Sequence, residues 1–364
     1  MPQTSTGYQQ LTLLDQARRT DPDGKTARIV EMLNRENTIV QDAVTVEGNT
    51  QIGYLTTLRT GLPAITFRQL NAGVQPSKST TKQIHFTAAL LEGFSRVDER
   101  LIELDLDGPG LRMSEVMPFM ESMGQTIAST MFYGDVRVNP ARFTGLSAYF
   151  ANLNTTFQQQ PENLVNPSST APDSGRNVFD ASSNYEGEVF GTPSNGNNTS
   201  IWLVCWGPQS VQAFFPRGTR AGIYHKDWGL FPVDDGRGLG ATYGAWLDQY
   251  KAQIGLAVQD WRQVVRIANI DVIALASAGD DNDQSANLIK NMMQARRFIQ
   301  RPDAGKLCFY ANRTALTYLD VKMANKFNAF LKMEEIEGMG KVMTLLGIPI
   351  RRCDALLNTE AQVS

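Results

Sequence analysis

The chain is 364 residues long and 42% of its residues are hydrophobic, which is enough to bury a substantial core and predicts a folded protein of two or three domains. Its 34 basic and 37 acidic side chains leave a formal net charge of −3 at pH 7. Proteins that bind nucleic acid by neutralising phosphates need clustered Lys and Arg. The charge balance therefore argues against that kind of binding.

Cysteine usage and the N-terminal residues bear on the compartment. Cys205, Cys308 and Cys353 are far apart and odd in number, which favours reduced, buried thiols over a disulfide framework. The first ten residues lack the basic and apolar regions of a secretory signal. No stretch approaches the ~18 apolar residues of a membrane span. We therefore expect the chain to fold in a cytoplasm.

The first part of the chain predicts an arm followed by a long hairpin. Residues 1–45 are polar, with a short helix candidate at Thr26–Asn34 followed by Thr38–Val46, and this arm is expected to dock its apolar side chains elsewhere. Tyr54–Leu70 and Thr80–Phe94 then interleave apolar and polar residues around turn signals, which predicts two strands and a wide tip. A two-stranded ribbon is marginally stable by itself. We expect this one to lie on another surface, such as a neighbouring copy, because it carries Leu55, Leu58, Ile65, Phe67, Ile84 and Phe86.

A long amphipathic helix is predicted at Arg112–Tyr133, ending at Gly134. Pro118 should bend this helix rather than abolish it, because it lies within the first two turns. Apolar residues recur at three- and four-residue spacing and make a single stripe: Met113, Val116, Met117, Met120, Gly124, Ile127 and Met131. Such a stripe is more often core than binding surface, although methionine suits surfaces that repack.

The remaining chain predicts a mixed α+β fold. Residues 151–199 are rich in Asn, Gln, Ser, Thr, Pro and Gly, which is typical of an irregular surface insertion. A Gly-rich turn is expected at Asp234–Gly244 and an extended segment at Lys251–Ile270. The predicted strands are Ser200–Trp206, Gln209–Phe215, Lys306–Tyr310, Lys341–Leu345 and Ile348–Cys353. The predicted helices are Ser285–Phe298, capped by Asp283 or Ser285, and Arg313–Phe330, capped by Asn312.

Sequence motifs for chemistry are weak. Gly236–Ala241 superficially matches a dinucleotide fingerprint with Asp260 beyond it, but the preceding Gly229–Asp235 is turn-like and a flexible loop is favoured. Gly338–Lys341 lacks the spacing and the Ser/Thr of a phosphate-binding loop. Asp280–Asp283 lacks the central Gly and final Glu of a calcium loop, which favours a helix N-cap.

Catalytic and metal centres also lack suitable residues. His85 and His225 are the two histidines, which leaves little material for a triad or a zinc site. The pairs Arg296–Arg297 and Arg351–Arg352 indicate surface solvation or inter-subunit ion pairs. We predict no catalytic, cofactor-binding or metal-binding residue, no cofactor, and a protein that is not an enzyme.

The order of these elements resembles the major capsid proteins of tailed bacteriophages with the HK97-type fold. The matching features are an arm, an extended hairpin, a long helix ending in Phe132–Gly134, and Asn139–Leu146 after it. Trp261–Ile270 and Leu346–Ala355 are similar to stretches of shell proteins from short-tailed phages. Together these cover most of the chain.

The resemblance implies an architecture, which we state as an expectation. The helical unit comes last here, which suggests rearranged connectivity, because commoner members carry it mid-chain. The implied regions are an N-terminal arm at 1–50, an E-loop hairpin at 51–94, a P-domain at 95–150 and 200–270 with a spine helix at 112–133, a polar surface insertion at 151–199, and an A-domain with C-terminal strands at 271–364.

The resemblance also implies a function and partners. The chain would assemble in the cytoplasm of a host bacterium into hexamers and pentamers of an icosahedral head. This head would enclose double-stranded DNA without binding it tightly. Scaffolding, portal and cement or decoration proteins are candidate partners, and no membrane is expected. Some members crosslink subunits through an E-loop lysine, but Lys78 and Lys82 are better explained as solvated. The alternative is a phage decoration or receptor-binding protein, suggested by the polar insertion at 151–199.

Overall fold

The computed structural model describes residues 35–104, 108–153, 177–182, 196–234, 240–277, 283–324, 331–336 and 340–363. The described residues form two compact units. Unit 1 contains residues 90–126 and 220–253, and unit 2 contains residues 35–89, 127–219 and 254–363. The helix candidate at Thr26–Asn34 and most of the insertion at 151–199 lie outside the described residues, so these predictions stay predictions.

Unit 2 is built on a mixed sheet. The strands of this unit, in chain order, are β1 (Thr45–Glu47), β2 (Gly53–Gly61), β3 (Thr80–Thr87), β5 (Val178–Asp180), β6 (Asn198–Trp206), β7 (Val211–Phe215), β10 (Val264–Asp271), β11 (Lys306–Ala311), β12 (Leu331–Ile336), β13 (Gly340–Leu345) and β14 (Ile348–Arg352). Of these, β2 and β3 pair with each other in a separate two-stranded sheet. β6 is central: β10 and β11 flank it, both antiparallel. β5 joins β10 in parallel, and β14 joins β11 in parallel. β13 and β12 extend the sheet beyond β14 as an antiparallel pair.

The helices of unit 2 pack on this sheet. They are α2 (Thr38–Asp42), the end of α4 (Gly108–Tyr133), α5 (Leu146–Tyr149), α6 (Val272–Ser277), α7 (Asp283–Phe298) and α8 (Arg313–Ala324), with short 3₁₀ turns η2 (Trp261–Gln263) and η3 (Pro302–Ala304). The predicted cap of α8 is confirmed, since Asn312 Oδ1 accepts a hydrogen bond from Ala315 N at 2.8 Å.

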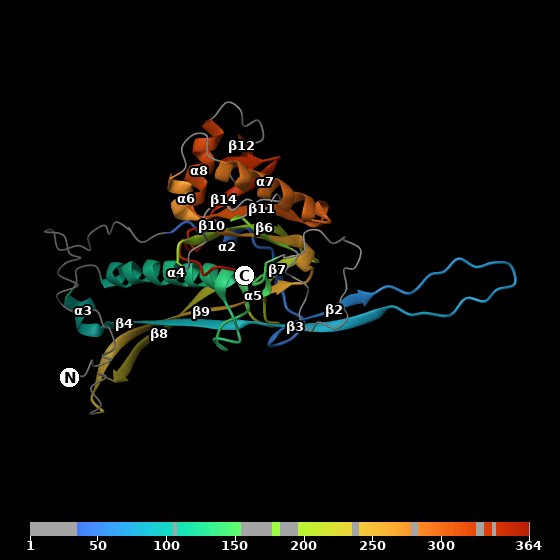
Figure 1. Cartoon of the computed structure of the whole chain (residues 1–364). Coiled ribbons are helices and arrows are strands. Elements are labelled where there is room, and N and C mark those ends of the chain that lie inside the picture. Colours follow the sequence, from blue (N-terminus) through green and yellow to red (C-terminus); the bar gives the residue numbers. More distant parts are fainter. Residues whose placement is uncertain are drawn as a thin grey trace, which may run out of the picture. The chain divides into compact units, whose positions relative to one another are not determined.

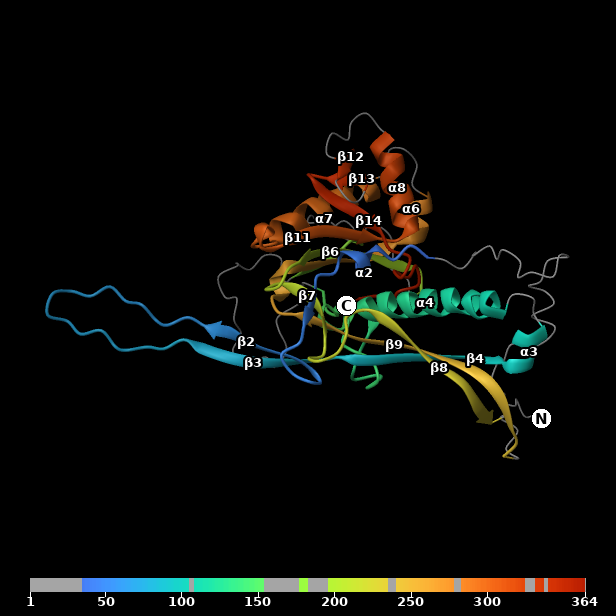
Figure 2. The same cartoon turned by 180° about the vertical axis from the view of Figure 1, so that it is seen from behind.

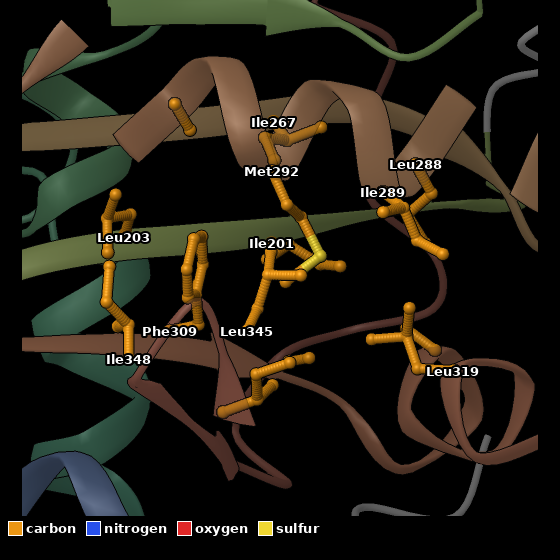
Figure 3. Close-up of a cluster of buried hydrophobic side chains, with 14 of the residues drawn as sticks. Ile201, Leu203, Ile267, Leu288, Ile289, Met292, Phe309, Leu319, Leu345 and Ile348 are labelled. Carbon is orange, nitrogen blue, oxygen red and sulfur yellow. The ribbon is translucent and has the colours of Figure 1, made fainter. Parts of the chain in front are cut away.

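The main core of unit 2 lies between the sheet and α7 and α8 (Figures 1 and 2). Because side chains alternate along a strand, Ile201 and Leu203 of β6 face these helices, where Met292 of α7 and Leu319 of α8 meet them (Figure 3). Trp202, between the two, points to the opposite face and packs against Phe132 and other aromatic rings. Every residue of β6 is therefore buried.

Unit 1 is smaller. It contains most of β4 (Ala89–Asp98), the helix α3 (Glu99–Leu104), the first part of α4, and the hairpin of β8 (Ile223–Asp234) and β9 (Thr242–Val258) up to Gln253. β8 and β9 pair antiparallel over most of their length, and β4 adjoins β9. The helix α4 ends at Tyr133 before Gly134, as predicted, and it continues through Pro118.

Two predicted strands of the hairpin have wrong boundaries. The strand predicted at Tyr54–Leu70 ends at Gly61, where the pairing of β2 with β3 becomes irregular, and Pro63 beyond it has no N–H to donate to a ladder. The strand predicted at Thr80–Phe94 is two strands, because the chain breaks at Ala88, whose N–H donates to Ile52 O. Gly61 and Pro63 mark the first break in the sequence, whereas no turn residue marks the second at Ala88.

Three further expectations need correction. Gly229–Asp234, interpreted as turn-like, belongs to β8, where Gly229 has φ 77° at a bulge and Pro232 is tolerated because β8 lies at the edge of its hairpin. The extended segment at Lys251–Ile270 is interrupted by η2, because the Asp260 side chain accepts from Arg262 N. The helix predicted at Arg313–Phe330 is described to Ala324, and the strand β12 beyond it was missed.

The predicted state of the cysteines is confirmed. Cys205, Cys308 and Cys353 are free and buried. Burial raises the pKa of the Cys308 thiol to about 12 and that of Cys353 to about 11.

We predict that these thiols resist modification in the folded chain. At pH 8 a thiol reagent should label the native protein far more slowly than the urea-unfolded protein, because the thiolate is the reactive form. The raised folded pKa also means that the protonated thiols stabilise the fold. Their contribution to the free energy of unfolding is fully present below pH ~9, the ordinary thiol pKa, and is lost as the pH rises to 11 and beyond. Urea unfolding at pH 8 and pH 11 tests this. Labelling of the native chain at the unfolded rate would contradict it.

A second prediction concerns Gly255 of β9. A Cβ added there would lie 2.4 Å from the ring of Phe214, which is fully buried. Gly255→Ala should therefore lower the free energy of unfolding by about 1–3 kcal/mol through overpacking. Gly73→Ala is the matched control, because a Cβ at Gly73 meets nothing within 4 Å. Equal urea midpoints for the two variants would show that this contact relaxes without cost.

Candidate assembly surfaces

The base of the β2–β3 hairpin is anchored on unit 2. Phe86 of β3 is buried against Phe214 and Ala257, and Tyr54 packs there too, with its ring centroid 5.8 Å from that of Phe214. Gly53 pairs with Thr87 in the ladder, and a Cβ added to Gly53 would come within 2.0 Å of Phe86 O. The close approach requires glycine at this position. The hairpin therefore has a fixed root.

Beyond this root the chain runs as an exposed loop, which we call the hairpin loop, residues 62–78 (Figure 1). Most of its large apolar side chains are almost fully accessible: Ile65 is 90% exposed and Phe67 is 109% exposed. Leu62 and Leu70 are 82% and 92% exposed. Ser77 Oγ donates to Ala64 O at 2.8 Å across the loop. Contiguous exposed apolar side chains of this kind mark interaction surfaces in soluble proteins.

The predicted apolar stripe of α4 divides into two halves. Ile127 and Met131, in unit 2, are buried. Met113 and Met117, in unit 1, are 66% and 61% exposed, and Met120 is 38% exposed. The second half of the stripe is therefore core, as is more common for such stripes, and the first half is a second exposed apolar surface, of the kind that methionine suits.

An ionic centre fixes α2 to the sheet of unit 2. The carboxylate of Asp42 is 1% exposed. It accepts hydrogen bonds from Lys306 Nζ at 2.8 Å and from Arg351 Nη1 at 2.7 Å. Tyr310 donates its hydroxyl proton to the other carboxylate oxygen at 2.9 Å and accepts from Trp206 Nε1. The basic residue Arg351 thus makes an ion pair within the chain rather than the solvated or inter-subunit contact predicted.

A second ionic centre lies in unit 1. Arg112 of α4 donates to Asp248 at 2.8 Å and pairs with Asp227 at 2.9 Å. His225 Nε2 lies 2.7 Å from the same Asp248, and its ring stacks on Tyr250. The pKa of Asp227 is lowered, chiefly by the hydrogen bond from the Gly229 N–H and next by the Arg112 guanidinium. These contacts join the start of α4 to the β8–β9 hairpin.

The candidate chemical motifs do not form a site. Asp283 begins α7, and the preceding residues 278–282 lie outside the described chain. Of the dinucleotide-like motif, 235–239 lie outside it too, and the strand β9 follows rather than a helix. His85 lies in β3 opposite Leu55. Arg352 pairs with Asp354 and Glu36 within the chain.

Two absences hold for the described residues. Within them, no group of three or more His, Cys, Asp or Glu side chains is placed to bind a metal ion. No helix in the described parts is both long and apolar enough to span a membrane.

Comparison with known proteins decides the family. A family model described as major capsid protein GP7 matches residues 21–364. The chain belongs to this family. It is a phage major capsid protein that forms the shell of the head, a structural component of the virion.

A solved structure agrees with this assignment. A chain from the near-atomic structure of bacteriophage Epsilon15 is 31% identical, with a TM-score of 0.70, and 99% of each chain is covered. Capsids of bacteriophage JBD30 (9% identity, TM-score 0.46, 89% of this chain and 93% of that one) and of the native GTA particle (10%, 0.39, 71% and 98%) also match. A search of curated proteins found no match. The resemblance drawn from the sequence is confirmed, and the fold is a mixed α/β HK97-like capsid fold.

We predict that this capsid protein depends on Asp42. Asp42→Ala would leave the Arg351 guanidinium, 14% exposed, without its carboxylate, and breaking a buried ion pair costs about 3–5 kcal/mol. Urea unfolding of the subunit measures the loss.

The matched control for Asp42 is Asp135→Ala, which removes a surface pair with Arg137, whose side chain is 76% exposed. Exposed pairs contribute about 0–1 kcal/mol. If the two variants lose the same stability, the Asp42 centre is not an anchor.

Proposed function

We propose that the hairpin loop is the principal assembly element of this shell protein and that it buries its apolar side chains on a neighbouring copy. One observation carries the proposal: Ile65 and Phe67 remain fully accessible in the isolated chain while the hairpin root is anchored. Closed shells form when the same surface on every copy is satisfied by its neighbour.

The regions implied by the resemblance follow as part of this proposal. The hairpin at 51–94 acts as the E-loop. The family match and the position of the long helix support the remaining assignments: an arm at 1–50, a P-domain at 95–150 and 200–270 with its spine helix at 112–133, a polar surface insertion at 151–199, and an A-domain with the C-terminal strands at 271–364.

The assembly that follows is an icosahedral head of hexamers and pentamers around double-stranded DNA. Scaffolding, portal and cement proteins are its candidate partners. The net charge of −3 supports a lining that confines DNA without binding it tightly, because phosphate neutralisation needs clustered basic residues. The exposed Met113 and Met117 of α4 supply further apolar surface for subunit contacts. The alternative of a decoration or receptor-binding protein is not favoured, because the family match covers residues 21–364.

We predict that polar substitution of the loop abolishes assembly without unfolding the subunit. The double variant Ile65→Ser with Phe67→Ser should keep the melting temperature of the wild type within about 2 °C, because exposed substitutions change stability by less than ~0.5 kcal/mol. Sedimentation and electron microscopy should show soluble subunits in place of shells.

The matched control for the loop is Gln69→Ala, an exposed polar position between the same strands. This variant should assemble normally. Shells of normal size and yield from the double variant would rule out the loop as the principal assembly element.

A further inference from the structure

The β2–β3 hairpin is basic over its whole length. Residues 48–91, which contain the hairpin and its loop, carry no acidic side chain and four basic ones: Arg59, Arg68, Lys78 and Lys82. All four basic side chains are exposed. Because the segment holds no carboxylate, nothing within it neutralises this charge.

The positive charge accompanies the apolar side chains of the hairpin loop. Lys82 of β3 lies opposite Leu58 of β2, near the end of the strand pairing. Arg68 and Lys78 lie in the loop itself, where Arg68 directly follows the fully accessible Phe67. A surface that covers this loop must therefore be apolar and also carry negative charge.

Unit 1 carries a segment of the opposite charge. Residues 98–121, from the end of β4 into α4, contain seven acidic and two basic side chains. Both basic side chains are already paired within their own chain. Arg100 lies 2.6 Å from Glu103, and Arg112 lies 2.8 Å from the buried Asp248. The segment is therefore negative overall.

The same segment presents exposed apolar side chains. Met113, Met117 and Met120 of α4 recur at four- and three-residue spacing, so they share one face of the helix. Glu121 follows Met117 by one turn and borders this face. Leu104, the last residue of α3, is 68% exposed. The Glu103 side chain beside it in the chain is 52% exposed.

We call these residues the acceptor surface: Glu103, Leu104, Met113, Met117, Met120 and Glu121. We propose that the acceptor surface of one copy binds the hairpin loop of a second copy, with Arg68 and Lys78 facing its carboxylates. The inference rests on the proposed function and adds where the loop binds and which charges direct it.

The hairpin loop is the fitting occupant for two reasons. It is apolar and basic where the acceptor surface is apolar and acidic, and each surface remains exposed in its own chain. The family also builds its shell from many copies, so every acceptor surface has a loop available. Opposite charges across an interface speed association and disfavour wrong contacts.

The test reverses the charges in the full chain and measures the yield of shells by sedimentation. Arg68→Glu with Lys78→Glu reverses the loop, and Glu103→Lys with Glu121→Lys reverses the acceptor surface. Each pair alone should lower the yield about tenfold or more, because like charges then face each other. All four changes together should restore the yield to within about twofold of the wild type, because opposite charges face again.

A matched control uses acidic residues outside the acceptor surface. Glu334→Lys with Glu335→Lys, both exposed in β12, should not rescue the reversed loop. None of the positions changed in the loop or the acceptor surface is buried, and urea unfolding of each variant checks that the subunit keeps its fold. Met117→Lys, at a 61% exposed position, is a second acceptor variant that the reversed loop should also rescue.

Three results would overturn the proposal. The first is a fourfold variant that assembles no better than either pair alone. The second is equal rescue by the β12 control. The third is a reversed loop that forms shells at normal yield but with less DNA, which would mean that the basic residues contact DNA. The proposed function has its own test, because loss of assembly in Ile65→Ser with Phe67→Ser supports the loop whichever surface receives it.

Discussion

The two-sided burial of β6 is the constraint on which unit 2 depends. Ile201 and Leu203 point to the core under α7 and α8, while Trp202 points to the aromatic cluster with Phe132. A strand buried on both faces cannot shift register by one residue without exchanging its two sets of side chains. The positions of β10 and β11 on either side of β6 are thereby fixed.

The two faces of this sheet have different chemistry and different consequences. The face toward α7 and α8 is apolar and supplies stability by burial. The opposite face carries two ionic centres, Asp42 with Arg351 and Glu360 with Arg266. Each joins the sheet to a segment more than ninety residues away in sequence, the first to α2 and the second to the C-terminal residues around Glu360. Segments without a core of their own are positioned by these centres.

The sequence predicted the elements whose pattern is local. The period of α4 and its end before Gly134, the cap at Asn312 and the strands β6 and β11 follow from neighbouring residues. The ionic centres could not be predicted, because nothing in the residues around Asp42 or Glu360 indicates a partner so distant in the chain. The edge strand β8 was missed because Gly229 and Pro232 resemble a turn, and only pairing with β9 makes a bulged strand of them.

The hairpin root is buried within its own chain, whereas the hairpin loop leaves apolar side chains exposed. At the root, Phe86 is buried with Phe214, so the strands leave unit 2 in a fixed direction. In the loop, Ile65 and Phe67 find no cover from the described part of their own chain. Burial of such side chains contributes about 1.5–3 kcal/mol each. Binding to another chain would supply that burial. If a neighbouring copy covers the loop, as proposed above, the packed root already limits where the loop can lie, which lowers the ordering cost of that association.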